Sequence, residues 1–281
     1  MKIVIPTKNR EETIKTHRYF ENCDYYVLVH NLRQFNKYKK YSDETGLNMG
    51  RVIITNVKSD QFGLTRQREW ACENLIDKDE WFVFADDNIK TIQAVGEPFY
   101  NEPVLDVKGN KSLRDFYKAE CSPDRFFEIV NEGINKADQY GVHHYGFSPV
   151  DNFFFRGKKW KEVAYIIGKL MVWHNTGRLQ FDHKITMEDF ELTAQSLLKF
   201  GCAMVNNYVY PVAGHYEKGG MGTVDERLKD RQKDVKILMD KYPGLFRLKS
   251  KDVDNPDLSL RFYDHAKVKQ WRLMMKAMKG V

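Results

Sequence analysis

Short apolar segments that alternate with polar, helix-like segments constrain the fold of this chain more than any other feature. The first segment reads KIVIP and closes at Pro6, and a later one, WFVFA, is apolar at every position. Strands that are apolar on both faces are typical of a mainly parallel sheet covered by helices on both sides. The sequence therefore predicts an α/β fold that opens with a βαβ unit. The four expected strands cover residues 1–6, 25–30, 51–55 and 81–85.

The same alternation continues through the second half of the chain. After a loop that contains Gly63, a helix is expected over residues 64–75, and another over 123–140, begun by Ser122 and ended at Gly141. An amphipathic pattern predicts a helix over 188–200. Further strands are expected over 164–173 and 203–212, and an irregular loop over 93–112.

Composition and charge bound the class of protein. A chain of 281 residues with 42% hydrophobic residues can form one core with a C-terminal appendage. Its four cysteines form no C-x-x-C pair and are interpreted as reduced thiols. Neither a signal peptide nor a membrane-spanning run is recognised, so a cytoplasmic protein is expected. Residues 227–281 contain 15 Lys or Arg and 7 Asp, a net charge of +8, which favours a polyanionic partner or an ordinary solvated helix surface.

The segment WFVFADDN places two adjacent carboxylates at the end of an apolar strand. Asp86 and Asp87 would raise each other's pKa unless a cation lies between them. Mg²⁺ and Mn²⁺ prefer oxygen ligands and commonly bind one or two carboxylates together with substrate phosphates. One interpretation is therefore a platform for a metal and a diphosphate, with Asn88 as a further oxygen ligand. The other is a purely structural turn at the strand end.

Four motifs occur in the order seen in family-2-like glycosyltransferases of the GT-A fold: IVIPTKNR, GLTRQREW, ADDN and MEDFEL. The chain resembles that superfamily from Lys2 to about Gly222. The resemblance implies a GT-A, Rossmann-like mixed sheet flanked by helices, a nucleotide-sugar donor and a divalent metal, Mn²⁺ or Mg²⁺. We expect this domain over residues 1–222, with a basic helical extension over 223–281 packed on it.

The resemblance also implies roles for individual residues. Arg66 would face the base or the diphosphate, although Gln67 stands where the superfamily usually has Asn. Without the resemblance, Arg66 would be interpreted as a cation on a helix surface. Asp86 would bind the ribose or the metal, and Asp87 or Asn88 the metal. The first strand-end loop, which would wrap the nucleotide, contributes Pro6, Thr7, Lys8 and Arg10.

Two later segments complete the implied site. In the resembling enzymes an Asp of an E-D pair is the general base, so Asp189 is the candidate and Glu188 the second choice. In an enzyme that retains anomeric configuration, one of them would instead stabilise the oxocarbenium-like state; as acids in a helix's first turn, both also suit a structural role. His215 is a candidate third metal ligand or a surface residue, and the glycines at 219, 220 and 222 form either a lid or an ordinary connection.

The acceptor is less constrained by the sequence. The segment HHYGFSPVDNFFFRGKKW interleaves aromatic and basic residues, which suits a sugar or an extruded base. The chain also resembles the TET-associated glycosyltransferases of bacteriophages, which implies a UDP-sugar donor and 5-hydroxymethylcytosine in DNA as acceptor, in the cytoplasm of a host cell. The alternatives are a transferase that acts on a surface glycan or lipid carrier, a nucleic-acid-binding protein without catalysis and, last, a nucleotidyltransferase.

Overall fold

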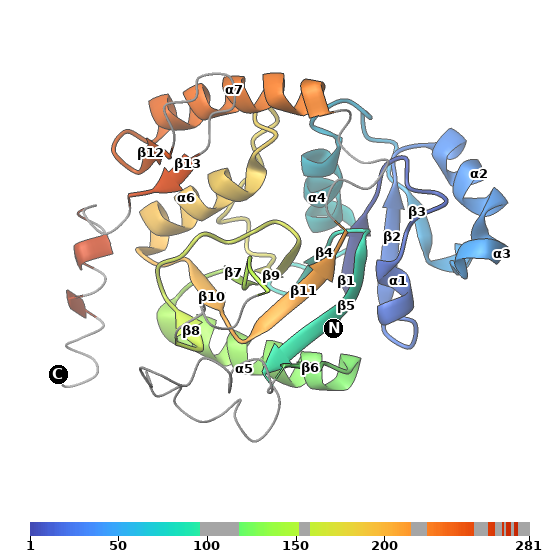
Figure 1. Cartoon of the computed structure of the whole chain (residues 1–281), viewed down its shortest axis with the longest axis horizontal. Coiled ribbons are helices and arrows are strands. Elements are labelled where there is room, and N and C mark those ends of the chain that lie inside the picture. Colours follow the sequence, from blue (N-terminus) through green and yellow to red (C-terminus); the bar gives the residue numbers. More distant parts are fainter. Residues whose placement is uncertain are drawn as a thin grey trace.

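The computed structural model describes residues 1–95, 118–151, 158–214, 224–249 and 258–261, with 266, 268–270 and 273–274 near the C-terminus. In this part of the chain the strands form a central eight-stranded sheet and two small sheets (Figure 1). The central strands are β1 (Ile3–Pro6), β2 (Tyr25–Val29), β3 (Val52–Ile54), β4 (Trp81–Ala85), β7 (His144–Phe147), β8 (Trp160–Lys161), β9 (Leu170–His174) and β10 (Met204–Asn206). The small sheets contain β5 (Ile89–Val95), β6 (Lys118–Glu120) and β11 (Val209–Ala213), and β12 (Phe246–Leu248) with β13 (Leu258–Leu260).

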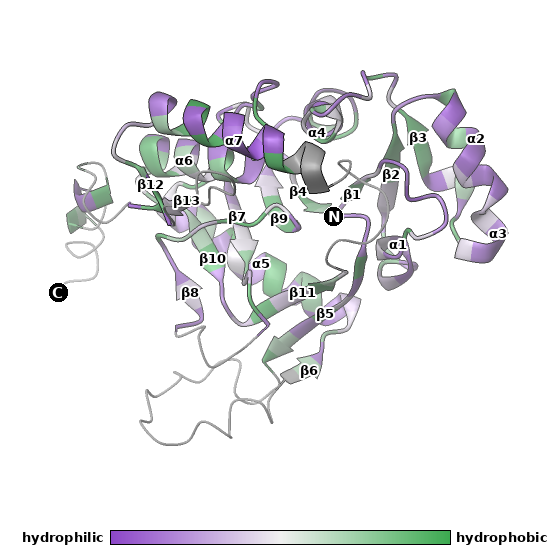
Figure 2. Cartoon of the chain, turned by 45° about the horizontal axis from the view of Figure 1, so that its top comes forward, coloured by the Kyte–Doolittle hydropathy of each residue, from purple (hydrophilic) through white to green (hydrophobic). Residues whose placement is uncertain are grey.

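Helices lie around the central sheet. They are α1 (Thr16–Tyr19), α2 (Leu32–Lys40), α3 (Ser42–Thr45), α4 (Gly63–Asn74), α5 (Pro123–Tyr140), α6 (Glu188–Phe200) and α7 (Val224–Lys241), with one 3₁₀ turn, η1 (Met49–Arg51). Figure 2 shows hydrophobic residues along the strands of the central sheet and hydrophilic ones along α2 and α7. Among the described residues, no helix combines the length and the apolar character that crossing a membrane requires.

The order of the central sheet is β3-β2-β1-β4-β9-β7-β10-β8. Strands β3, β2, β1 and β4 are parallel, whereas β9 is antiparallel to both of its neighbours, β4 and β7. The predicted α/β fold with a mixed sheet flanked by helices is confirmed. Strands β1, β4, β7, β9 and β10 are buried along almost their whole length, as expected for a sheet covered on both faces.

Local signals set several helix boundaries. The Ser122 side chain accepts a hydrogen bond from the Arg125 backbone N–H at 3.3 Å, and Gly141 takes a left-handed conformation with φ of 64°, so α5 begins and ends as predicted. The predicted helix over 188–200 is likewise confirmed as α6, which ends at Gly201 with φ of 72°.

Three expectations need correction. The strand expected over 164–173 is shorter, because the Gly168 backbone bonds to side chains instead of a neighbouring strand and β9 begins only at Leu170. The strand expected over 203–212 is two strands in different sheets, separated by a turn in which Asn206 Oδ1 accepts from the Tyr208 N–H at 2.9 Å. The loop expected over 93–112 begins in strand, since β5 runs to Val95 and pairs with β11; residues 96–117 lie outside the described part.

The C-terminal extension also differs in part from the expected helices. It begins with α7, but β12 and β13 pair antiparallel within it. Packing of Phe246 and Leu258, both buried, joins this strand pair to the hydrophobic core. The division of the chain at residue 222 stays a prediction.

The first turn of α4 packs tightly against the end of β2. A Cβ built on Gly63 would lie 2.6 Å from Cε1 of His30, whose side chain is fully buried. We expect Gly63→Ala to lower the free energy of unfolding by about 1–3 kcal/mol, because the ring cannot move away without displacing its neighbours. Urea unfolding measures this, and the double variant with His30→Ala should be less destabilised than the sum of the two single variants. Additive effects would contradict the close contact.

Candidate active site

The polar residues singled out at the strand ends meet at a change of direction in the sheet topology. Strands β2 and β3 lie on one side of β1, and β4 lies on the other. In open α/β sheets, ligands bind outside the carboxyl ends of the strands at such a switch point. Thr7 follows the end of β1 and Asp86 follows the end of β4, so both lie at this position.

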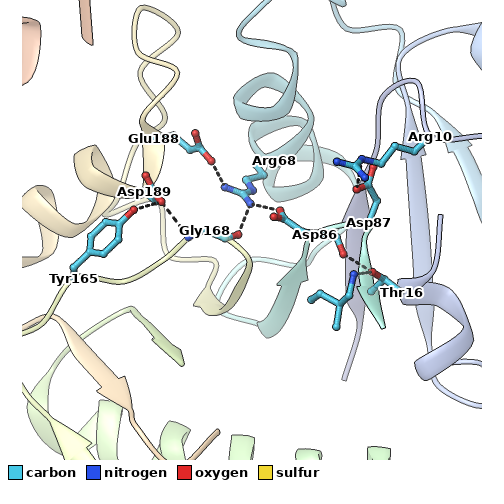
Figure 3. A network of polar contacts seen from close by, with 10 residues as sticks. Arg10, Thr16, Arg68, Asp86, Asp87, Tyr165, Gly168, Glu188 and Asp189 are labelled. Carbon is cyan, nitrogen blue, oxygen red and sulfur yellow. Dashed lines mark hydrogen bonds and ion pairs between the residues drawn. The ribbon is translucent and has the colours of Figure 1, made fainter. Parts of the chain in front are cut away.

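Arg68, on α4, is the centre of the site (Figure 3). Its side chain is completely buried, and its guanidinium contacts Glu188 Oε1 through Nη1 at 2.8 Å and Asp86 Oδ1 through Nη2 at 3.5 Å. Nη2 also donates to the Gly168 carbonyl at 2.7 Å, and the guanidinium carbon lies 5.6 Å from the centre of the Phe84 ring. One buried cation therefore joins the end of β4, the segment before β9 and the start of α6.

Asp189 lies beside this centre and has its own set of donors. Its Oδ2 accepts hydrogen bonds from the Tyr165 hydroxyl and, at 3.3 Å, from the Gly168 N–H, while Oδ1 accepts from the Phe190 N–H at 2.9 Å. Burial raises the pKa of both Glu188 and Asp189 above the ordinary carboxyl range, and the nearby Arg68 guanidinium opposes that shift. A carboxylate with a raised pKa is a stronger proton acceptor than an exposed one.

Asp87 belongs to a different cluster, although it follows Asp86 directly. Its Oδ2 accepts from the Thr7 hydroxyl at 2.5 Å, and its Oδ1 lies 3.1 Å from Nε of Arg10. The Tyr38 hydroxyl lies 2.6 Å from the Thr7 hydroxyl and accepts from the Arg10 N–H at 3.1 Å. Burial raises the pKa of Asp87 to about 7 against the opposing effects of Arg10 and Thr7. Two of the residues predicted to wrap the nucleotide, Thr7 and Arg10, therefore bind a predicted metal ligand.

Asn88 holds the segment that follows. Its Nδ2 donates to the Gly214 carbonyl at 2.8 Å, which joins the start of β5 to the end of β11. The Thr16 hydroxyl, at the start of α1, donates to the Asp86 carbonyl and accepts from the Ile89 N–H at 2.9 Å, so the turn between β4 and β5 is fixed by side chains (Figure 3). His215 and the glycines at 219–222 lie outside the described residues.

The remaining predicted nucleotide contacts lie apart from the acids. Lys8 Nζ donates to the Asp60 carbonyl at 3.0 Å, and Arg66 Nε lies 3.6 Å from the Asp60 carboxylate. Pro6 is the last residue of β1 and is buried. Lys8 and Arg66 thus both contact Asp60, on the loop between β3 and α4, whereas Arg68, two positions after Arg66, reaches the acids.

The oxygen atoms available to a metal ion are unevenly distributed. Within the described residues, no group of three or more His, Cys, Asp or Glu side chains is arranged to hold one. Both oxygens of Asp87 are engaged by Thr7 and Arg10. By contrast, Oδ1 of Asn88 is buried with no hydrogen-bond partner in the described part of the chain, and the Asp86 side chain is 32% exposed. Asp86 and Asn88 therefore fit a metal ion better than Asp87 does.

Three residues of the site, Arg68, Tyr165 and Thr16, are not among those expected from the sequence. For Arg68 a signal was present, because this residue lies four positions after Leu64 and three before Ala71 and so shares a helix face with both. A charged residue on the buried face of a helix needs a partner. No comparable pattern marks Thr16, and Tyr165 lies in the apolar run 164–173 that was expected to be a buried strand.

Comparisons with known proteins gave few matches. No protein-family model matches the chain, and no curated protein matches it. Among solved structures, it is similar to the crystal structure of glucosyl-3-phosphoglycerate synthase from Mycobacterium tuberculosis in complex with Mn²⁺ and uridine-diphosphate-glucose, with 11% identity and a TM-score of 0.45 over 92% of this chain and 85% of that chain. The chemistry of the site is therefore inferred from the residues of this chain.

Two arginines of α4 provide a matched test of this geometry. Arg68→Gln leaves the buried acids around Glu188 without their cation and should lower the free energy of unfolding by about 3–5 kcal/mol. Arg66→Gln breaks a partly exposed pair and should cost less than about 1 kcal/mol. Urea unfolding of both variants checks the difference. Equal losses would show that Arg68 is not the buried partner of these acids.

Proposed function

We propose that this chain is a metal-dependent glycosyltransferase that binds a nucleotide-sugar at the ends of β1 and β4 and transfers the sugar to a hydroxyl group. The observation that supports the proposal is the Arg68 bridge: one buried guanidinium contacts both Asp86, at the switch point, and Glu188, the residue next to Asp189. A donor bound outside β1 and β4 would thus face a carboxylate able to accept a proton. The motif order that resembles GT-A glycosyltransferases points to the same chemistry.

The donor side of the site would use Asp86 and Asn88. We assign Mn²⁺ or Mg²⁺ to these two residues because their oxygens are the least engaged at the strand end. Such an ion supplies positive charge that stabilises the leaving diphosphate of a UDP-sugar. Asp87 would act through Thr7 and Arg10, by fixing the loop after β1 that would border the nucleotide. His215 stays a predicted further ligand.

The acceptor side would use Asp189. The Tyr165 hydroxyl already donates to Asp189 Oδ2, and an acceptor hydroxyl would donate to the same oxygen. As that hydroxyl attacks the anomeric carbon, the bond from this carbon to the diphosphate breaks and the hydroxyl proton passes to Asp189. Glu188 has the second role: its Oε1 holds Arg68 and so orients the guanidinium beside Asp86.

The acceptor that we propose is 5-hydroxymethylcytosine in DNA. The support for it is the net charge of +8 over residues 227–281, which favours salt-sensitive contacts with phosphates, and the resemblance to the phage enzymes. A lipid carrier is the second candidate, because Leu273 and Met274 near the C-terminus are 69% and 51% exposed beside basic residues.

Donor turnover and transfer by the purified chain test the proposal. We expect transfer from a UDP-sugar in the presence of Mn²⁺, its loss on addition of EDTA, and its recovery when Mn²⁺ is restored in excess. Asp189→Asn should lower kcat by about 10²–10⁴-fold, because it removes the proton acceptor. The control Asp43→Asn, an exposed acid on α3, should leave kcat unchanged.

The outcomes separate the parts of the proposal. Transfer only to DNA that contains hydroxymethylcytosine supports the DNA acceptor, whereas transfer only to a lipid-linked glycan replaces it with the second candidate. Turnover that persists in EDTA would rule out the metal. The absence of turnover with every UDP-sugar and acceptor in the panel, with Asp189→Asn indistinguishable from the wild type, would rule out the transferase.

The pH dependence of transfer follows from the raised pKa of Asp189. Below that pKa the carboxyl is protonated and cannot accept the acceptor proton, so kcat should fall as pH decreases. Because burial shifts the pKa upward, the acidic limb should lie above the range of ordinary Asp residues, whose pKa is about 3.9. Measuring kcat from about pH 4 to about pH 9 locates the limb. A limb at the ordinary Asp value would contradict this assignment.

A further inference from the structure

A buried carboxylate of the C-terminal extension holds the residues that lead into α6. Asp234, on α7, is 1% exposed. Its Oδ2 accepts three hydrogen bonds: from the Thr186 N–H at 2.6 Å, from the Thr186 hydroxyl at 2.5 Å and from the Met187 N–H at 2.9 Å. These donors belong to the two residues immediately before the Glu188-Asp189 pair.

Helix α6 has no cap of its own at this end. Met187 occupies the N-cap position and its side chain makes no capping hydrogen bond. Backbone N–H groups around a helix start need acceptors from elsewhere, and negative charge is favourable near this end of a helix. Asp234 supplies both, although it lies 48 residues after Thr186 and 47 after Met187 in the chain.

Helix α7 also reaches the helix that carries Arg68. The Lys233 ammonium lies 5.9 Å from the centre of the ring of Phe62, the residue that precedes α4. Figure 1 shows α7 running along the edge of the molecule where α4 and α6 lie. Neighbouring residues of α7 therefore contact the starts of both helices that contribute to the Arg68 bridge.

We propose that Asp234 is a positioning residue for the transfer reaction: by anchoring Thr186 and Met187 from α7, it sets the place of Asp189 relative to the Arg68 bridge. The proposal rests on the proposed function. It assigns the start of the C-terminal extension a part in catalysis, besides any part in binding a polyanion.

The same pair of helices offers a matched control. Glu191, one turn into α6, accepts on Oε1 from the Tyr242 hydroxyl at 2.5 Å and from Lys241 Nζ at 2.8 Å. Tyr242 follows the end of α7 and is buried. This second tie fastens the same helices together, but it does not touch residues 186–189. Tyr242→Phe therefore weakens docking of α7 without releasing the start of α6.

The test compares Asp234→Ala, Asp234→Asn and Tyr242→Phe in the full chain. We expect Asp234→Ala to lower kcat by at least about tenfold, because displacing a reacting group by about 1 Å is costly, while KM for the donor changes little. Asp234→Asn keeps an oxygen acceptor and should recover part of this loss, with a displaced acidic limb of kcat. Tyr242→Phe should lower the urea midpoint and leave kcat and its pH profile unchanged.

Amide hydrogen exchange gives a readout that does not depend on activity. Exchange at residues 186–189 should be faster in both Asp234 variants than in Tyr242→Phe at matched global stability. This comparison holds even where Asp234→Ala fails to fold, because Asp234→Asn suffices. Unchanged kcat in the Asp234 variants of an active enzyme would overturn the positioning role. If the wild type turns over no donor, the proposed function fails. Equal amide exchange at residues 186–189 in all variants would separately overturn the anchoring of these residues by Asp234.

Discussion

The arrangement of this site depends on one buried cation. Arg68 has no exposed side-chain surface, and a guanidinium stays charged at any ordinary pH, so the fold must surround it with acceptors. It finds them in three segments that are far apart in the sequence: the end of β4, Gly168 before β9, and Glu188 at the start of α6. In turn, the acids at Asp86 and Glu188 tolerate their proximity because the guanidinium lies between them. Removing the guanidinium would leave these carboxylates without a neighbouring positive charge, and removing the carboxylates would leave the guanidinium buried without a negative one.

The turn that follows β4 divides Asp86 and Asp87 between two clusters. Asp86 directly follows β4 and contacts Arg68, whereas Asp87 lies in the turn and contacts Thr7 and Arg10. A pair that looks like one site in the sequence is thus divided (Figure 3). Asp86 contacts the buried guanidinium, and Asp87 stabilises the loop after β1. This division also explains why the oxygens of Asp87 are less available to a metal ion than those of Asp86.

The C-terminal extension has a basic surface suited to a polyanion and also packs against α6 and the start of α4. Its composition alone does not distinguish these two roles. Its net positive charge suits a polyanion, but Asp234 and Tyr242 make buried contacts with α6, and Lys233 lies over Phe62. The sequence does not reveal that Asp234, an acid within a basic helix, is buried. Charge patterns indicate which faces of a helix are solvated, but they do not identify buried polar contacts. The start of the extension therefore belongs to the architecture of the site, whatever its basic residues bind.

The sequence by itself determined the elements whose signals are local. Short apolar runs specified β1 to β4, and Ser122 and Gly141 bounded α5. The strand-end position of Asp86 followed from the run WFVFA. Such signals are local because periodicity, capping and the burial of continuous apolar runs act over a few residues. Only the tertiary structure decided which of two arginines on α4 reaches the acids, how Asp86 and Asp87 divide, where Gly168 interrupts a predicted strand, and that Asp234 anchors α6. Each of these depends on a partner distant in the sequence. Such partners are chosen by packing and by the need to satisfy buried polar groups, which no local pattern encodes.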